Sequence, residues 1–316
     1  MVSKRVEGNK LTKPTENQPL VTVNILSFNR KNELRNTLQK VYEQDYKNIE
    51  VIVVDNASTD GSPEMVEKEF PEVKLIRLKK NIGIAGWNKG FEAAKGEYVL
   101  VLDDDSYPLN ETISKAIQRM NEDKSIGIVA CDIFNTSMNF SETENWPENP
   151  YSFVGCGALI EKRRLNIVGY FDENIFIYLN ELDLTARFLN AGFKVVFSND
   201  CKIIHAQSFA SRGKARNPFA SRYRFEHFFW SMSYFLLTKF SAPYVYFSTF
   251  KWLVNRFLIT VKYGFWTSFF SGLFKIISNL GLLMKKRKPL KREVQKFYRY
   301  GNVFAWFDRD YFGKSK

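Results

Sequence analysis

The sequence predicts an α/β fold with a mostly parallel sheet, followed by a region of basic, aromatic helices. Between residues 20 and 130, short apolar runs alternate with stretches whose apolar residues have helical spacing. This alternation is typical of parallel strands joined by crossover helices. Residues 212–316 hold 21 Lys and Arg but only 4 Asp and Glu, and 29 of the 50 aromatic residues. We therefore expect a loose tail at 1–18, an α/β domain at 19–215 and a second, helical region at 216–316.

The elements of the α/β domain follow from apolar periodicity and from the polar residues between the runs. Strands are expected at 21–26, 49–54, 74–78, 98–102, 126–130 and 194–197. Helices are expected at 32–44, 62–70, up to 94, 111–122 and up to 189. Because the carboxyl ends of parallel strands meet at one edge, polar residues that end the strands should gather there.

Two sets of carboxylates end predicted strands. Asp103, Asp104 and Asp105 follow the run 98–102, and Pro108 blocks its continuation. Three adjacent carboxylates repel one another unless a divalent cation or a hydrogen-bonding ligand offsets the repulsion, so a ligand site competes here with a solvated acidic turn. Asp55 ends the second strand, where it suits a ribose or a base amide, or else a simple helix-capping turn.

Other patterns exclude several classes of site. Gly83 and Gly86 do not form the glycine pattern of dinucleotide-binding folds, and the sequence contains no P-loop motif. The three cysteines are far apart, which indicates neither a disulfide framework nor a cysteine metal site. The N-terminal residues lack the apolar core of a secretory signal, so we expect a cytoplasmic protein.

The second half of the domain offers further candidates, each with a structural alternative. The polar segment 135–150, with Trp146, is a substrate loop or an exposed insertion. The run 155–158 permits close backbone approach to a ligand or to a neighbouring strand. Glu181 and Asp183 lie in the first turn of a predicted helix, where acidic residues also favour the helix dipole. His205, one of two histidines, ends a strand as a structural residue or a metal ligand.

In this order, the motifs resemble the inverting family 2 glycosyltransferases of the GT-A fold, in particular their rhamnosyl- and galactofuranosyltransferase-like bacterial members. The resemblance covers about residues 20–210. It rests on Val23–Arg30, Val54–Gly61, Asn81–Asn88, Leu102–Asp105, Gly155–Ala158, Gly169–Glu173 and Asn180–Leu184.

The resemblance implies a site for a nucleotide-sugar donor, linked to UDP, dTDP or GDP, and for Mn²⁺ or Mg²⁺. The implied metal ligands are Asp103, Asp105 and His205. The residues implied to bind the donor are Ser27, Asn29, Arg30, Asp55, Asn81, Gly83, Asn88, Asp103 and Asp104. The residues implied to bind the acceptor are Trp146, Gly155, Cys156 and Gly157.

The resemblance also implies the catalytic base. The family usually has Glu-Asp at the start of this helix, with the Asp as base, and here the register places Asn180 and Glu181 at those positions. Glu181 is therefore the expected base, which takes the proton of an acceptor hydroxyl as that oxygen attacks the anomeric carbon. Asp183 is the alternative.

The basic, aromatic region predicts contact with a membrane. Apolar windows at 228–250 and 257–283 are interrupted by Lys239, Lys262 and Lys275, which favours helices lying in the headgroup plane of an anionic membrane. Spanning or re-entrant helices, a soluble helical core and a homo-oligomer interface are the alternatives. Nucleic acid is not an expected partner, because no recognised binding motif accompanies the charge.

These expectations combine into one function and two rivals. The first is a metal-dependent, inverting glycosyltransferase bound peripherally to the inner face of the cell membrane, acting on a lipid-linked or growing glycan. One rival is a nucleotidyltransferase that makes nucleotide sugars, although the position of its Gly-rich basic loop reads Ser27 to Arg30 here. The other is a membrane-bound scaffold with a degenerate transferase domain.

Overall fold

The computed structural model describes residues 18–206 and 221–298. Apart from Gln18, the predicted tail lies outside the described residues, as do 207–220 and 299–316. The strands are β1 Val21–Ser27, β2 Ile49–Asp55, β3 Lys74–Arg77, β4 Tyr98–Asp103, β5 Ser106–Pro108, β6 Ile126–Asn135, β7 Phe140–Ser141, β8 Ala158–Glu161 and β9 Lys194–His205. The helices are α1 Lys31–Glu43, α2 Ser62–Glu69, the 3-10 turn η1 Gly83–Gly86, α3 Trp87–Ala93, α4 Thr112–Glu122, α5 Lys162–Val168, α6 Asn180–Asn190, α7 Arg222–Lys239, α8 Tyr244–Tyr263, α9 Trp266–Ser278, α10 Leu280–Lys286 and α11 Arg292–Phe297.

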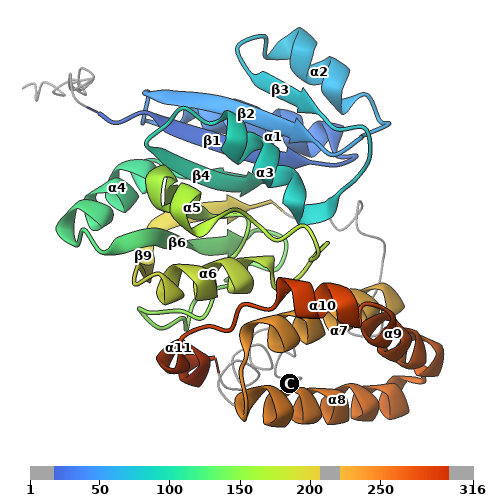
Figure 1. The fold of residues 1–316 in the computed structure, drawn as a ribbon. Coiled ribbons are helices and arrows are strands. Elements are labelled where there is room, and N and C mark those ends of the chain that lie inside the picture. The colour runs from blue at the N-terminus through green and yellow to red at the C-terminus, as the bar shows by residue number, and fades with distance from the viewer. Residues whose placement is uncertain (1–17, 207–220, 299–316) are drawn as a thin grey trace, which may run out of the picture.

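The strands form one mixed sheet in the order β3-β2-β1-β4-β8-β6-β9-β5, with β7 paired to β6 (Figure 1). The first four strands are parallel, as predicted, and their register pairs Ser27 with Asp55 and Leu26 with Asp103. Strand β8 was not predicted and runs antiparallel to both neighbours. No helix separates β6 from β8, and a chain that returns without a crossover pairs antiparallel.

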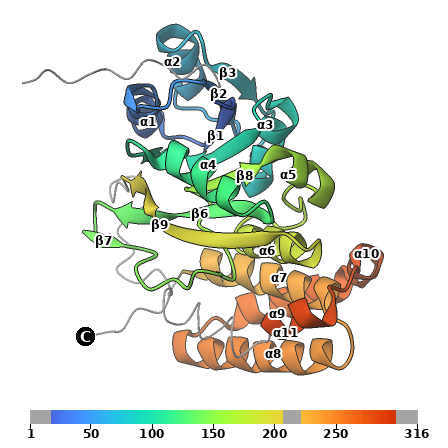
Figure 2. The same cartoon turned by 90° about the vertical axis from the view of Figure 1, so that its left-hand side faces the viewer.

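Two layers of helices cover the sheet (Figure 2). Helices α1, α2 and α4 pack one face, with Leu38 and Ile117 among the buried side chains. Helices α3, α5 and α6 pack the other face, with Trp87 and Phe188 fully buried. The parallel strands are therefore buried on both sides, which explains their near-continuous apolar sequence.

The C-terminal helices form a further layer that packs on α6 (Figure 1). Helix α7 is largely buried, and α8 and α9 lie outside it, with Trp252 and Phe269 turned inward. Within the described residues, no single helix is long and apolar enough to cross a membrane, although α9 and α10, bent by 60°, pass that test as a pair. Each of the two apolar windows therefore folds as more than one helix.

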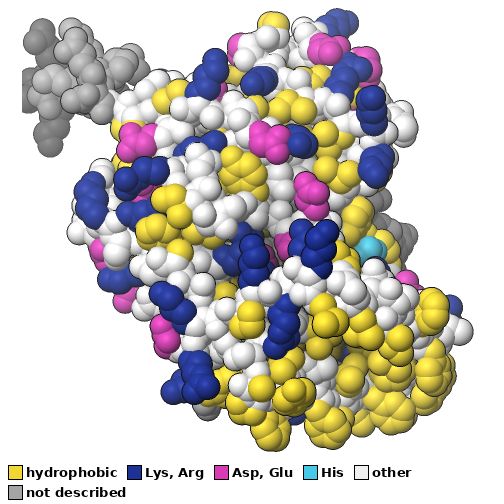
Figure 3. Space-filling view, in the orientation of Figure 1, with side chains coloured by type: hydrophobic (Ala, Val, Ile, Leu, Met, Phe, Trp, Pro, Cys, Tyr) yellow, Lys and Arg dark blue, Asp and Glu magenta, His cyan; other side chains and the backbone are white. Residues whose placement is uncertain are grey.

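The outer side of this layer is strongly apolar, and we call it the apolar face (Figure 3). It consists of large side chains on α8, α9 and α10 that are 41–75% exposed. They are Tyr246, Phe247, Phe250, Val254, Phe257, Leu258, Val261, Trp266, Phe270, Phe274, Ile277, Leu280 and Met284. Residues 244–288 contain eight Lys and Arg and no Asp or Glu. An apolar surface of this extent, without negative charge, is unusual for a protein that remains in water.

Gly83, just before α3, lies in close contact with Phe176 in the loop before α6, and a substitution can test the importance of this contact. The φ of Gly83 is +69°, and a Cβ there would lie 2.1 Å from the carbonyl oxygen of Phe176. We expect Gly83→Ala to lower the free energy of unfolding, measured in urea, by at least about 2 kcal/mol. Gly192→Ala is the matched control, because φ is +88° but no atom lies within 4 Å of the added Cβ; it should cost about 1 kcal/mol. Equal losses would show that the contact with Phe176 is unimportant.

Candidate functional site

A cluster of possible metal ligands lies at the carboxyl end of β4. Ligand atoms of Asp103, Cys156 and His205 lie within 4.8 Å of one another. His205 Nε2 is also 3.3 Å from Asp105 Oδ1, so both outer carboxylates of the triplet adjoin the imidazole. Carboxylate oxygens with one imidazole fit Mn²⁺, and the thiol of Cys156 adds a softer donor beside them. Cys156, predicted to contact the acceptor, thus adjoins the metal ligands.

Glu142 holds the other side of the imidazole. Its Oε1 lies 2.9 Å from His205 Nδ1 and accepts a hydrogen bond from the side-chain amide of Asn135 at 2.7 Å. Burial alone would lower the pKa of His205, but hydrogen bonds to Asp105 and Glu142 raise this pKa to about 9. Metal binding requires the neutral imidazole, so the ion must displace this proton.

Arg30 balances the negative charge of the acidic triplet. Its Nη1 donates to Asp104 Oδ1 and to Asp105 Oδ2, each at 2.9 Å. Asp104 also accepts a hydrogen bond from the backbone N–H of Phe28, and burial raises its pKa to about 7 against the opposing charge of Arg30. Asp104 therefore ties β1 and α1 to the metal cluster, and Arg30 adjoins the triplet.

The ends of β1 and β2 place two buried polar side chains next to each other. Ser27 and Asp55 are paired in the sheet and buried. Asp55 Oδ2 accepts a hydrogen bond from the backbone N–H of Ser58. Among the described residues, Asp55 Oδ1 and Ser27 Oγ have no hydrogen-bond partner. Two neighbouring buried oxygens without partners are costly unless a ligand with hydrogen-bonding groups satisfies them.

Three of the amides predicted to bind the donor make hydrogen bonds within the loops around Ser27 and Asp55. Asn29 Oδ1 accepts from Thr59 N, and Asn81 Oδ1 accepts from Gly83 N. Asn88 makes two hydrogen bonds to the backbone of Phe171. These bonds fix the backbone of the loops near Ser27 and Asp55. In Asn88 both the nitrogen and the oxygen of the side-chain amide are hydrogen-bonded.

Glu181 lies beside the metal cluster. A Cβ on Gly155 would lie 2.5 Å from Glu181 Oε1 and 3.2 Å from the indole of Trp87, so only glycine fits there. Burial raises the pKa of Glu181 to about 7, and the charge of Asp103 contributes to this rise. The structure thus brings Glu181, Gly155 and Asp103 together, and the carboxyl is poised near neutral pH.

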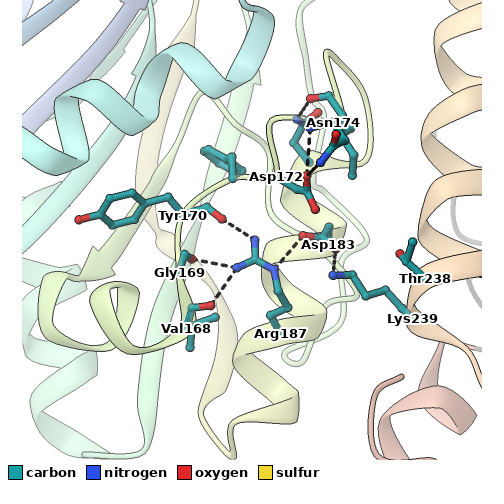
Figure 4. A network of polar contacts seen from close by, with 12 residues as sticks. Val168, Gly169, Tyr170, Asp172, Asn174, Asp183, Arg187, Thr238 and Lys239 are labelled. Atoms are coloured by element: carbon teal, nitrogen blue, oxygen red, sulfur yellow. Dashed lines mark hydrogen bonds and ion pairs between the residues drawn. The ribbon is translucent and has the colours of Figure 1, made fainter. Parts of the chain in front are cut away.

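Asp183 has a different environment (Figure 4). Its side chain is fully buried, where Oδ2 accepts from Arg187 Nε at 2.8 Å and Oδ1 lies 3.1 Å from Lys239 Nζ. Both oxygens of Asp183 therefore face cations within a fully buried site, which leaves neither oxygen open to an acceptor hydroxyl. This arrangement favours Glu181 over Asp183 as the base.

The remaining predicted acceptor residues lie apart from Glu181. Trp146 packs on Phe197 and lines an open cleft of about 780 Å³ between β6, β7 and β9. Gly157 is close to Ile133 and Ile203, so it permits packing within the sheet. Of the predicted acceptor residues, Gly155 therefore lies beside Glu181 and Cys156 lies beside the metal ligands. Trp146 lines the cleft, and Gly157 packs in the core.

Sequence reasoning missed Glu142, Arg187 and Lys239. Glu142 lies in the predicted loop 135–150 without any spacing that relates it to His205. Lys239 interrupts an apolar window and was assigned to the headgroup plane, but its side chain is 9% exposed and faces Asp183. The (i, i+4) spacing of Asp183 and Arg187 on the predicted helix was the one signal available.

The family model described as glycosyl transferase family 2 matches residues 22–188. The chain belongs to this family. The match includes β1 to α6, and with them Asp55, the acidic triplet and Glu181. His205 and the C-terminal helices lie beyond it.

Curated relatives match about a third of the family 2 chain. It is 35% identical over 108 residues to the Escherichia coli UDP-Glc:α-D-GlcNAc-diphosphoundecaprenol β-1,3-glucosyltransferase WfaP. It is 33% identical over 109 residues to TuaG of Bacillus subtilis, a putative teichuronic acid biosynthesis glycosyltransferase. Each match spans 33% of this chain and 43% of the relative.

Solved structures establish the fold over a longer stretch. The mannosyltransferase PcManGT of Pyrobaculum calidifontis, solved with GDP-Man and Mn²⁺, has a TM-score of 0.55 at 19% identity, covering 96% of this chain and 86% of its own. TarS of S. aureus has a TM-score of 0.52 at 19% identity, covering 68% of this chain and 38% of its own. The predicted GT-A fold is confirmed.

The contact between Glu142 and His205 leads to a prediction about metal affinity. Glu142→Gln should weaken Mn²⁺ binding about 10- to 100-fold, because the carboxylate orients the imidazole and increases its basicity. Calorimetric titration of Mn²⁺ in the presence of UDP or GDP measures this change. Glu144→Gln is the control, since Glu144 is exposed on the same segment. An unchanged Mn²⁺ affinity in Glu142→Gln would contradict the role of Glu142.

Proposed function

We propose that this family 2 protein is a metal-dependent, inverting glycosyltransferase, which moves a sugar from a nucleotide-sugar donor to a lipid-linked or growing glycan. The observation that carries the proposal is the convergence of three features at one sheet edge. These are the Asp103–His205 cluster, the unpartnered oxygens of Ser27 and Asp55, and the carboxyl of Glu181. A rival scaffold function does not require this convergence.

The donor half of the site is assigned to β1, β2 and β4. Asp55 and Ser27 accept hydrogen bonds from the base or ribose, which satisfies their unpartnered oxygens. Asp103, Asp105 and His205 hold Mn²⁺ or Mg²⁺, whose charge, when bound, stabilises the diphosphate of the leaving nucleotide. Arg30 donates to the buried carboxyls of Asp104 and Asp105, and its charge opposes the rise in pKa that burial causes at Asp104.

Glu181 is assigned as the general base. With a pKa of about 7, its carboxylate is both populated at neutral pH and basic enough to accept a proton from the acceptor hydroxyl. The oxygen then attacks the anomeric carbon on the face opposite the nucleotide, and the configuration inverts. Gly155 allows the carboxyl of Glu181 to lie directly against the backbone, because a Cβ at this position would lie 2.5 Å from Glu181 Oε1.

The acceptor and the sugar are assigned by chemical class. WfaP of E. coli and a Campylobacter jejuni relative, 32% identical over 109 residues, are named as glucosyltransferases that act on undecaprenol-linked acceptors. These names support a hexosyl donor, and the name of WfaP supports UDP as its nucleotide. The motif resemblance to rhamnosyl- and galactofuranosyltransferases extends the proposed donor class to deoxyhexosyl groups and to dTDP or GDP. We assign the cleft at Trp146 to the glycan part of the acceptor, since aromatic platforms bordered by polar groups suit sugars.

The apolar face supports peripheral binding at the inner membrane surface, where a lipid-linked acceptor is located. The large side chains of α8 to α10 supply apolar area, and the basic cluster Lys285–Lys288 supplies attraction to anionic headgroups. Helices that lie in the headgroup plane account for the exposed apolar side chains without a spanning segment.

Glu181→Gln should abolish transfer but retain donor binding. Nucleotide release from a panel of UDP-, GDP- and dTDP-sugars with Mn²⁺ measures transfer or hydrolysis, and the donor-induced rise in melting temperature measures binding. In the unmodified protein, kcat should rise with pH through about 7, as the base loses its proton. Full activity in Glu181→Gln would exclude this base.

The stability of the same variant is the control against simple unfolding. The pKa of Glu181 is about 4.5 in the unfolded chain and about 7 in the folded protein, so the folded state binds the proton more tightly. The free energy of unfolding should therefore fall as the pH rises from about 4.5 to about 7, and stay at the lower value above that. At pH 8, Glu181→Gln should therefore melt at the same temperature as the unmodified protein or higher. A large loss of stability at pH 8 would contradict this sign.

Glutamates on the apolar face should prevent membrane binding. Phe247→Glu combined with Phe274→Glu places charges at positions that are 66% and 72% exposed, so the fold should persist while insertion becomes unfavourable. Sedimentation with vesicles that contain phosphatidylglycerol measures binding. Ile167→Glu is the control, because Ile167 is 67% exposed on α5. Undiminished sedimentation of the double variant would exclude the apolar face as the membrane contact.

A further inference from the structure

The turn that precedes the catalytic helix α6 has an unfavourable backbone. Tyr178 and Leu179 both have φ of 65°, in the left-handed region that residues with these side chains seldom adopt. Glu181 follows two residues after this turn. Consecutive residues in such a conformation persist only when their surroundings hold them in place.

Helix α7 supplies that support on the N-terminal side of the turn. Trp230 Nε1 donates to the carbonyl of Asn174 at 2.8 Å, and Ser231 Oγ donates to the carbonyl of Ile177 at 2.9 Å. Tyr234 donates to Asp172 Oδ2, also at 2.8 Å. Three side chains on two adjacent turns of α7 therefore bind the segment that leads into the turn.

A buried ion pair supplies the support on the helix side (Figure 4). Lys239, the last residue of α7, lies 3.1 Å from Asp183 in the first turn of α6. Arg187, one turn later on α6, binds the other oxygen of Asp183 and donates to the carbonyls of Val168, Gly169 and Tyr170. Asp183 is fully buried and the Lys239 side chain is 9% exposed, so solvent screens this pair little.

We propose that Lys239 is a positioning residue, whose ion pair with Asp183 fixes the first turn of α6 and thereby places Glu181 beside the metal cluster. The inference rests on the proposed function, because it uses Glu181 as the base. It also makes the C-terminal helices part of the catalytic unit. They carry the apolar face on their outer side and hold the base in place with their inner side.

The charges around Asp183 predict an order among the variants. Lys239→Met leaves Asp183 paired with Arg187 but removes the ion pair between α6 and α7. Asp183→Asn leaves two buried cations without their anion, which is the more damaging change. The double variant Asp183→Asn with Lys239→Met removes one of those cations, so it should be less impaired than Asp183→Asn alone.

The experiment combines hydrogen exchange with donor kinetics on the full chain. Lys239→Met should increase amide exchange at least tenfold in peptides that cover 176–184, with exchange in β1 to β4 unchanged. It should lower kcat for nucleotide release from UDP-, GDP- or dTDP-sugars with Mn²⁺ at least tenfold, and leave the donor KM within about twofold. Lys239→Arg should recover most of both losses. The control is Lys262→Met, which removes an exposed charge from α8.

Three results would overturn the inference. These are unchanged exchange at 176–184 in Lys239→Met, an equal increase throughout the sheet, or a kcat loss in Lys262→Met as large as that in Lys239→Met. If Lys239→Met does not fold, Trp230→Phe takes its place, because it removes the hydrogen bond to Asn174 and keeps an aromatic ring beside Tyr234 and Lys275; it should raise exchange in the same peptides. If the unmodified protein releases no nucleotide from any donor, the proposed function fails, and the exchange data still decide the role of Lys239.

Discussion

The crowding of negative charge at the end of β4 is the constraint on which the site depends. Three consecutive carboxylates are brought to one sheet edge, and two of them are buried. Arg30, at the start of α1, contacts Asp104 and Asp105, and His205, at the end of β9, contacts Asp105. Residues more than 170 positions apart are thus drawn together by charge balance, because unpaired carboxylates in a poorly solvated edge would repel one another strongly. The divalent cation assigned to this site adds to the same balance.

The polar residues around that edge have two different roles: some hold the loops in place, and others have oxygens that a ligand could satisfy. Asn29, Asn81 and Asn88 use their amides to hold loops in place, whereas Ser27 and Asp55 keep oxygens without a partner among the described residues. A folded chain satisfies nearly all of its buried polar groups. The exceptions therefore indicate where a ligand binds, and the satisfied amides hold the surrounding loops in place.

The C-terminal helices have two different sides. Their inner side packs on α6 through aromatic side chains and the Lys239–Asp183 pair, while their outer side carries the apolar face without any acidic residue. Lysines within the apolar windows thus differ in role: Lys239 neutralises a buried carboxylate and Lys275 lies over the ring of Trp230 at 4.6 Å, whereas Lys262 is exposed. Composition cannot distinguish them, because each lysine lies within an apolar, aromatic window of the sequence.

The sequence by itself determined that β1 to β4 follow one another along the chain as parallel strands, that Asp55 and the acidic triplet end two of them, and that Glu181 lies in the first turn of a helix. These features follow from periodicity and strand-end chemistry, which are local properties. The sequence did not determine the antiparallel β8, the contact of Glu142 with His205, or the burial of Asp183 between Arg187 and Lys239. Those depend on which segments meet across tens of residues, and burial, charge pairing and shared hydrogen bonds acquire their partners only in the folded chain. Only the tertiary structure, therefore, distinguished a carboxyl poised near neutral pH from one held between two cations two residues away.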